Sequence, residues 1–165
     1  MLEKFFWSYC DDYIEIIKNR VYKPEIFGEN ARKSGLYASY HTLLGMLKCF
    51  AIYIPHVTEE IYQGYFAAYE EPISIHKALI GPIADKDDIT EEEFKAGEKA
   101  VDIISELRKY KSERNLSLKE TINAAEVQMD YDIELKDAID DIKAVCSCRD
   151  IRISKGDTFE VNVLG

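Results

Sequence analysis

The densest group of positive charges in this sequence lies at the end of a predicted helix: Arg108, Lys109, Lys111 and Arg114. Tyr110 lies among them. Lysine and arginine side chains can contact phosphates, and an aromatic ring between them can stack on an unpaired base. The same pattern is also typical of a solvated helix end, where cations complement the helix dipole. Composition alone favours this second interpretation.

A second group of cations ends the first predicted helix and consists of Lys18, Arg20 and Lys23. The formal net charge of −10 argues against a nucleic-acid partner, because phosphate binding usually requires a basic surface. A net charge does not exclude a local basic surface, however. Both groups therefore stay candidates for phosphate contacts.

Three histidines could serve in catalysis or metal binding: His41, His56 and His76. None is followed by a second histidine or cysteine three or four positions later. Cys146 and Cys148 lack the second pair of ligands that a zinc site needs. A phosphate-binding glycine loop and the common nucleophile motifs are also missing. The sequence therefore predicts no catalytic residue, no metal ligand and no cofactor in this chain.

The elements that precede the cations are helical. Apolar residues recur at helical spacing from Phe5 to Tyr22, which predicts an amphipathic helix that starts almost at residue 1. A second helix is expected at about 30–53, and Pro55 ends it. Thr58 is expected to cap a third helix. The aromatic stripe of the first helix should pack in the core, and any part left exposed could serve as a dimer contact.

The helix that carries the densest cations has the strongest start signal. Thr90 and Glu93 have the spacing of a capping box, and the apolar stripe that follows continues to about Tyr110. Asn115 is well suited to a left-handed helix end. The basic group is thus expected in the last turns of a long helix.

The remainder of the chain has an α/β pattern. A strand is expected at 122–129 and an amphipathic helix at 132–145. Two alternating segments follow, at 151–153 and 159–163, and residues 155–157 between them predict the turn of a hairpin. The expected order is strand, helix, strand, strand.

Together these elements predict a mostly α fold, with a helical bundle over residues 1–115 and a small α/β unit over 116–165. A chain of 165 residues that is 47% hydrophobic and 32% charged is typical of one globular domain with a small appendage. No apolar run approaches the roughly 20 residues of a membrane span, and the N-terminus has no signal-peptide pattern. We therefore expect a cytoplasmic location and no membrane partner.

The order of several motifs resembles the C-terminal anticodon-binding region of class I valyl-tRNA synthetases. The first motif is Phe5-Phe6-Trp7-x-x-Cys10-Asp11-x-Tyr13-x-Glu15. Next come Pro55-His56-Val57-Thr58-Glu59-Glu60-Ile61-Tyr62 and Ser74-Ile75-His76. Residues 108–113 are similar to the basic helix end of the archaeal-type enzymes. The chain departs from the family in two places, with His56 where phenylalanine is usual and Tyr62 where tryptophan is usual.

This resemblance implies an antiparallel helical bundle of the class I synthetase anticodon-binding type, N-terminally truncated relative to the family. It implies a tRNA-binding domain that holds the anticodon stem-loop, with a valine tRNA as the expected partner. The catalytic signatures His-x-Gly-His and Lys-Met-Ser-Lys-Ser are absent. The chain is therefore expected to be a fragment or a stand-alone relative of a synthetase. The catalytic domain, with its ATP and Mg²⁺, would lie in a parent enzyme, an ATP-dependent valine-tRNA ligase.

Two alternatives remain open at this point. The first alternative is the same domain of an isoleucyl or leucyl synthetase, because the motif around Thr58-Glu59-Glu60 is shared with those enzymes. The second is a helical protein-interaction module that has lost RNA binding, for which the net charge of −10 is the best argument. Under the tRNA-binding hypothesis, the expected phosphate contacts are Arg108, Lys109, Lys111, Arg114, Lys18, Arg20 and Lys23.

Overall fold

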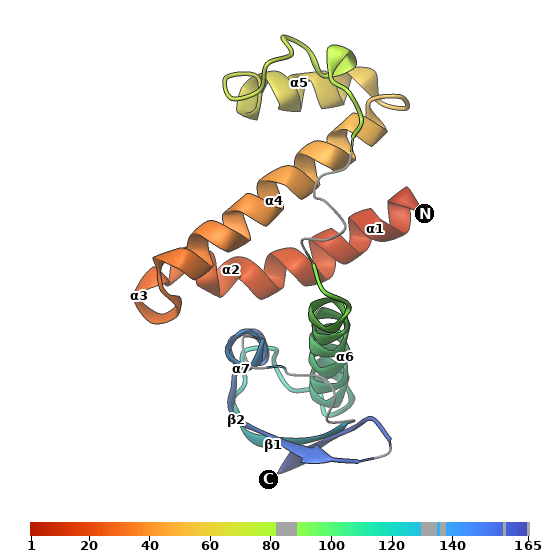
Figure 1. Cartoon of the computed structure of the whole chain (residues 1–165). Helices are drawn as coiled ribbons and strands as arrows, with labels where there is room; N and C mark the ends of the chain where they lie inside the picture. Colours follow the sequence, from red (N-terminus) through yellow and green to blue (C-terminus); the bar gives the residue numbers. More distant parts are fainter. Residues whose placement is uncertain (82–88, 130–134, 136–137, 157, 165) are drawn as a thin grey trace. The chain divides into compact units, whose positions relative to one another are not determined.

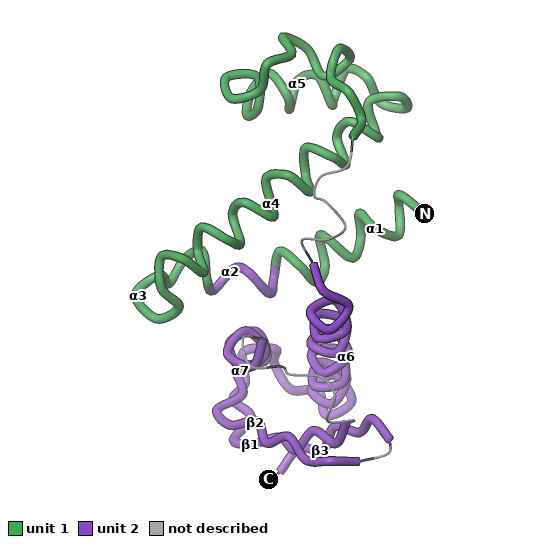
Figure 2. Tube along the Cα trace, viewed as in Figure 1, with its two compact units in different colours: residues 1–14, 20–86 green, residues 15–19, 87–165 purple. Residues whose placement is uncertain are grey.

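The computed structural model describes residues 1–81, 89–129, 135, 138–156 and 158–164 (Figure 1). The chain divides into two compact units, which Figure 2 distinguishes by colour. Unit 1 contains residues 1–14 and 20–86, and unit 2 contains residues 15–19 and 87–165. None of the helices in the described ranges combines the length with the apolar composition that a membrane span requires. The predicted mostly helical fold with a small α/β unit is confirmed.

The first predicted helix is present, but it is not α-helical throughout. Its parts are α1 (Leu2–Ser8), the π-helical turn η1 (Tyr9–Tyr13) and α2 (Ile14–Tyr22). Tyr9 and Tyr13 lie four positions apart, and their rings stack with centroids 5.7 Å apart. The Tyr9 hydroxyl lies 2.6 Å from Ser39 Oγ, and the Tyr13 hydroxyl donates to the Gly35 carbonyl at 3.4 Å. Both tyrosines therefore tie η1 to the next long helix.

The aromatic stripe of the first helix is only partly buried. Phe6 packs edge-on against Phe50, with ring centroids 5.7 Å apart, and Tyr9 is buried. Phe5 and Trp7, by contrast, keep 52% and 54% of their surface exposed. Part of the stripe thus serves as core, and part faces solvent.

The rest of unit 1 consists of α3 (Pro24–Phe27), α4 (Glu29–Phe50), α5 (Pro55–Tyr65) and the 3₁₀ turn η2 (Ile75–Lys77). Gly28 joins α3 to α4 with a φ of 87°, a conformation that side-chain-bearing residues rarely adopt. The core of the unit brings together buried residues from α4, from the segment 51–66 and from η2. They are Leu44, Leu47, Ala51, Tyr62, Phe66 and Ile75.

The prediction that Thr58 caps the third helix is wrong. Helix α5 begins three residues earlier, with Pro55 in its first turn and Ile54 at the N-cap. Thr58 is fully buried inside the helix, and its hydroxyl donates to the carbonyls of Ile54 and Pro55 at 3.0 and 3.1 Å. Proline is well suited to the first helical position because the missing N–H would have had no partner there. The helix therefore starts at the proline, and the threonine lies one turn inside it.

Unit 2 contains α6 (Glu91–Glu113), β1 (Ile122–Met129), α7 (Ile139–Cys146), β2 (Cys148–Lys155) and β3 (Glu160–Leu164). The capping box at the start of α6 is confirmed, since the Thr90 and Glu93 side chains each bond the other's backbone N–H. The strand predicted at 122–129 is also confirmed. For the helix predicted at 132–145, residues 132–134 and 136–137 lie outside the described part of the chain.

The predicted hairpin is wrong, although both of its strands exist. The strand order in the sheet is β2-β1-β3, so β2 and β3 both pair with β1 and not with each other. The β1–β2 pair is parallel, with Val127 opposite Ile153, and the β1–β3 pair is antiparallel, with Val127 opposite Val161. Alternation along the two strands predicts their faces correctly, but it does not identify the neighbour of each strand.

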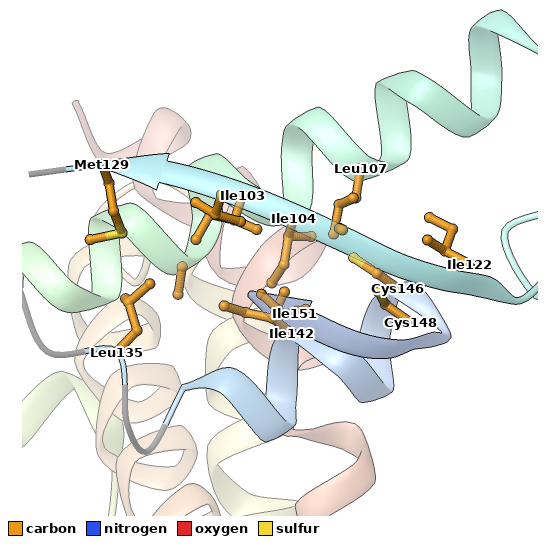
Figure 3. Close-up of a cluster of buried hydrophobic side chains, with 13 residues drawn as sticks. Ile103, Ile104, Leu107, Ile122, Met129, Leu135, Ile142, Cys146, Cys148 and Ile151 are labelled. Carbon is orange, nitrogen blue, oxygen red and sulfur yellow. The ribbon is translucent and has the colours of Figure 1, made fainter. Parts of the chain in front are cut away.

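The core of unit 2 shows that α6 belongs with the sheet. Figure 3 shows side chains of α6 and α7 gathered against the strands. The buried residues of this core are Ala100, Ile103, Ile104, Leu107, Ile122, Ala125, Val127, Met129, Leu135, Ile142, Cys146, Cys148 and Ile151. The division between the units therefore lies near residue 86, not at the predicted residue 115. The physical reason is that the apolar face of a three-stranded sheet needs a helical cover, and α6 supplies it.

Candidate nucleic-acid interface

The C-terminal end of α6 is closed by a Schellman motif. Asn115 has a φ of 54°, which confirms the predicted left-handed residue. The Asn115 N–H donates to the Ser112 carbonyl at 3.0 Å, and the Leu116 N–H donates to the Lys111 carbonyl at 2.9 Å. These two bonds satisfy carbonyls that a helix end otherwise leaves unpaired. The backbone around the predicted basic group is thus fixed by its own hydrogen bonds.

Lys111 is not part of the surface, and its prediction as a phosphate contact is wrong. Only 1% of its surface is exposed. Its Nζ donates to the carbonyls of Leu118, Glu120 and Cys146 at 2.8, 2.6 and 2.7 Å. All three ammonium protons can therefore be used inside the protein, and none is left for a phosphate. Burial lowers the pKa of Lys111 below the usual value for lysine.

The two thiols of this region are buried in the same core (Figure 3). Burial raises the pKa of Cys146 to about 11, while the positive charges of Arg108 and Lys111 act in the opposite direction. Burial also raises the pKa of Cys148. Both side chains are therefore protonated at neutral pH, and neither has the thiolate character that a nucleophile needs.

The exposed cations at this helix end are Lys109 and Arg114. The Lys109 side chain is 62% exposed, and its Nζ lies 3.4 Å from Glu106 Oε2. A solvent-exposed pair of this kind contributes little to stability, so Lys109 can exchange its partner at small cost. The Arg114 guanidinium carbon lies 3.9 Å from the centroid of the Tyr110 ring. Arg108 is half-buried. We call Arg108, Lys109, Tyr110 and Arg114 the α6 basic surface.

The second predicted group of cations does not form one cluster within a unit. Lys18 belongs to unit 2, and its Nζ lies 2.9 Å from Glu15 Oε1 on the same helix. Arg20 and Lys23 belong to unit 1, where Arg20 is half-buried and Lys23 is exposed. Lys23 lies between α2 and α3, at the N-cap of the short helix.

Two of the three histidines lie close to side chains of other residues, and His56 is exposed on α5. The His41 ring lies 4.3 Å from the Tyr37 ring and 5.3 Å from the Tyr40 ring, measured between centroids. His76 Nε2 lies 3.9 Å from Glu59 Oε2. Within the described ranges, no group of three histidine, cysteine or acidic side chains comes together as a metal site.

Glu59 is half-buried and has a structural role. Its carboxylate accepts hydrogen bonds from Gln63 Nε2, Ser74 Oγ and the Ile75 N–H, at 2.8 to 3.0 Å. These bonds hold the pKa of Glu59 below its usual value, with that from Gln63 the largest cause. Glu59 thus fixes η2 against α5. In the motif at residues 55–62, which contributes to the family resemblance, Thr58 and Glu59 therefore have structural roles.

A family model described as the anticodon-binding domain of tRNA ligase matches residues 1–128. The chain belongs to this family. The match covers all of unit 1 and continues through α6 into β1, and it confirms the resemblance that the motifs indicate.

Several valine-tRNA ligases are similar to this chain over most of its length. The chain is 37% identical to that of Rickettsia felis and 35% identical to that of Rickettsia prowazekii, each over 99% of its length. It is 33% identical to the valine-tRNA ligase of Ehrlichia canis over 88% of its length. The aligned parts amount to 18%, 19% and 18% of those proteins. The chain therefore spans about a fifth of the length of the relatives it matches.

Proposed function

We propose that this chain is the tRNA-binding part of a valine-tRNA ligase. In this proposal it holds the anticodon stem-loop of a valine tRNA, while a catalytic domain outside this chain charges the distant end of the same tRNA. The observation that carries the proposal is the similarity to valine-tRNA ligases over 99% of the chain, together with the family match. The relatives reported above are valine-tRNA ligases, which favours valine over the isoleucine and leucine alternatives.

The proposed phosphate contacts are those predicted cations whose side chains remain accessible. Lys109 and Arg114 are the first candidates because both are exposed at a helix end whose backbone is fixed. Arg108, Lys18, Arg20 and Lys23 follow. Lys111 is withdrawn from this set because its ammonium is buried among carbonyls. Recognition would then combine cations on phosphates with contacts to the unstacked bases of the loop.

The proposal assigns ATP and Mg²⁺ to the catalytic domain of the parent enzyme. Among the residues that the structure describes, no three histidine, cysteine or acidic side chains come together as a metal site. In this proposal, the role of this chain is to bind and position the substrate tRNA. Chemistry on the amino acid belongs to the rest of the parent protein.

A second candidate function is a protein-interaction module without RNA binding. Two observations favour it: the net charge of −10 and the half-exposed rings of Phe5 and Trp7. Exposed aromatic side chains are enriched in protein interfaces, including dimer contacts. This alternative predicts that the chain binds no RNA even at low salt.

A titration with RNA separates the two functions. The full chain is titrated at low and moderate salt with a valine tRNA transcript and, separately, with bulk tRNA. We expect binding to both at low salt and tighter binding to the valine tRNA at moderate salt, because non-specific contacts weaken first. No binding of either RNA at low salt would contradict the proposed function and favour the interaction module.

The α6 basic surface is tested by Lys109→Ala. We expect weaker binding of the valine tRNA and a salt dependence that is flatter by about one phosphate contact. Lys95→Ala is the matched control, because Lys95 lies on the same helix, is 53% exposed and pairs with Glu91 as Lys109 pairs with Glu106. If both variants change the salt dependence of tRNA binding equally, the change reflects net charge, and Lys109 does not contact a phosphate.

A further inference from the structure

Tyr110 and Arg114 form a stacked pair on the outside of unit 2. The two residues lie four positions apart, so their side chains project from the same face at the end of α6. The Arg114 guanidinium carbon lies 3.9 Å from the centre of the Tyr110 ring. Tyr110 is partly buried and packs against the hydrophobic core of the unit, whereas Arg114 is exposed. The ring is thus supported from within, and the guanidinium lies over it.

The backbone beneath this pair is fixed from two directions. The Schellman motif closes the helix immediately after Arg114, with the Leu116 N–H bonded to the Lys111 carbonyl. The Lys111 ammonium in turn holds the carbonyls of Leu118 and Glu120, in the loop that leaves the helix. It also holds the carbonyl of Cys146, at the end of α7. Because hydrogen bonds hold both the helix end and the loop, we expect the pair to require little ordering before it binds a ligand.

A supported guanidinium has a specific chemistry. Its plane can stack on a flat, electron-rich ring, while its N–H groups remain available at the rim for phosphate or base oxygens. The flat rings available in a single-stranded RNA are its unstacked bases, which are bound in this way by aromatic rings and arginine planes. Lys109, the residue before Tyr110, is exposed and can take a neighbouring phosphate.

We propose that the Tyr110–Arg114 pair is a stacking platform for one unpaired base of a bound RNA. This inference rests on the proposed function, because it requires that the chain binds RNA. It assigns Arg114 a role different from that of Lys109: the arginine contributes a plane as well as a charge. The two roles predict different responses to substitution.

The test compares variants that separate plane from charge. Arg114→Lys keeps the charge and removes the plane, and Tyr110→Leu removes the supporting ring but keeps an apolar side chain against the core. Each variant should bind the valine tRNA transcript about tenfold more weakly, with an unchanged salt slope. Tyr110→Phe keeps the ring and should recover most of the affinity that Tyr110→Leu loses. The control is Arg152→Lys, which makes the same change at an exposed arginine of β2 outside the platform and should bind as the unsubstituted chain does. Melting temperatures of all variants show whether a loss of affinity comes from misfolding.

A second measurement identifies the base. Transcripts of the valine tRNA are prepared with one abasic nucleotide at each unpaired position in turn, and each is titrated against the unsubstituted chain and Arg114→Lys. At one position, the abasic change should weaken binding to the unsubstituted chain about tenfold and have no effect on Arg114→Lys. Such non-additivity is the signature of a direct contact between the removed groups.

The outcomes distinguish the platform from the proposed function. If the unsubstituted chain binds the valine tRNA but Arg114→Lys binds equally well, the platform is wrong and the proposed function stands. Additive losses at every abasic position would also overturn the platform. If the unsubstituted chain binds no RNA, both proposals fail.

Discussion

Lys109 and Lys111 lie two positions apart on α6 and have opposite environments. Residues at this spacing point to nearly opposite sides of a helix. Lys111 lies four positions after Leu107 and seven after Ile104, so it continues the buried apolar stripe of the helix. That stripe was the signal that could have separated the two lysines. A lysine that follows an apolar stripe normally indicates that the buried face of the helix has ended. Lys111 is buried because its ammonium donates to carbonyls of other elements, and the sequence of the helix does not show those carbonyls.

At the residue scale, Lys111→Met is expected to lower the free energy of unfolding by about 2–4 kcal/mol. The substitution keeps the length of the side chain but leaves the carbonyls of Leu118, Glu120 and Cys146 without their shared donor. Urea denaturation followed by circular dichroism measures the change. The control is Lys109→Met, which makes the same chemical change at an exposed site and should stay within about 0.5 kcal/mol of the unsubstituted chain.

Equal stability of the two methionine variants would contradict this account of Lys111. It would mean that the cost of burying the ammonium cancels its hydrogen bonds. The lysine would then be a replaceable core residue, and the loop after α6 would be held by its other contacts.

At the scale of elements, the local signals at the two ends of α6 succeeded, whereas the pairing of the strands, which is non-local, was predicted wrongly. The capping box at Thr90 and the left-handed Asn115 were predictable because each depends on residues within one turn of the helix. The partners of β2 and β3 were not predictable in this way. A hairpin between them would have the same alternating pattern, and only the position of β1 between the two strands decides the pairing.

Thr58 gives an element-scale test of the corrected start of α5. For a residue at the N-cap, aspartate and serine are both good replacements. For a fully buried residue inside the helix, Thr58→Ser should cost about 1 kcal/mol for the lost methyl group, whereas Thr58→Asp should cost more than about 3 kcal/mol because it buries a charge. Thermal or urea unfolding of the two variants measures the difference. Similar stabilities for aspartate and serine would restore the interpretation of Thr58 as a cap.

At the scale of the whole molecule, the sequence predicted the classes of structure better than their division. The change from helices to an α/β pattern suggested a boundary at residue 115, but the apolar stripe of α6 packs on the sheet. The family model ends at residue 128, within β1, so it does not follow the division into units either. Tertiary packing decides which surface a long amphipathic helix covers. The apolar stripe of α6 is equally compatible with packing on other helices and with packing on a sheet.

The charge of the molecule also has to be considered at this scale. A net charge of −10 disfavours non-specific binding of nucleic acid, yet a local surface such as that of Lys109 and Arg114 can still act at short range. Salt screens distant charges beyond about 8 Å at physiological ionic strength, so nearby cations dominate a contact. We therefore expect non-specific tRNA binding to be weak, and we expect specific binding to depend on recognition of the anticodon loop.

Recognition of the anticodon loop is tested most directly with the anticodon arm alone. A hairpin with the anticodon stem and loop of a valine tRNA is titrated against the full chain, in competition with the intact tRNA. The control hairpin keeps the stem and replaces every loop base. We expect the first hairpin to compete with the intact tRNA and the control to compete at least tenfold less well. Equal competition by the two hairpins, or by neither, would contradict the claim that this chain recognises the anticodon loop.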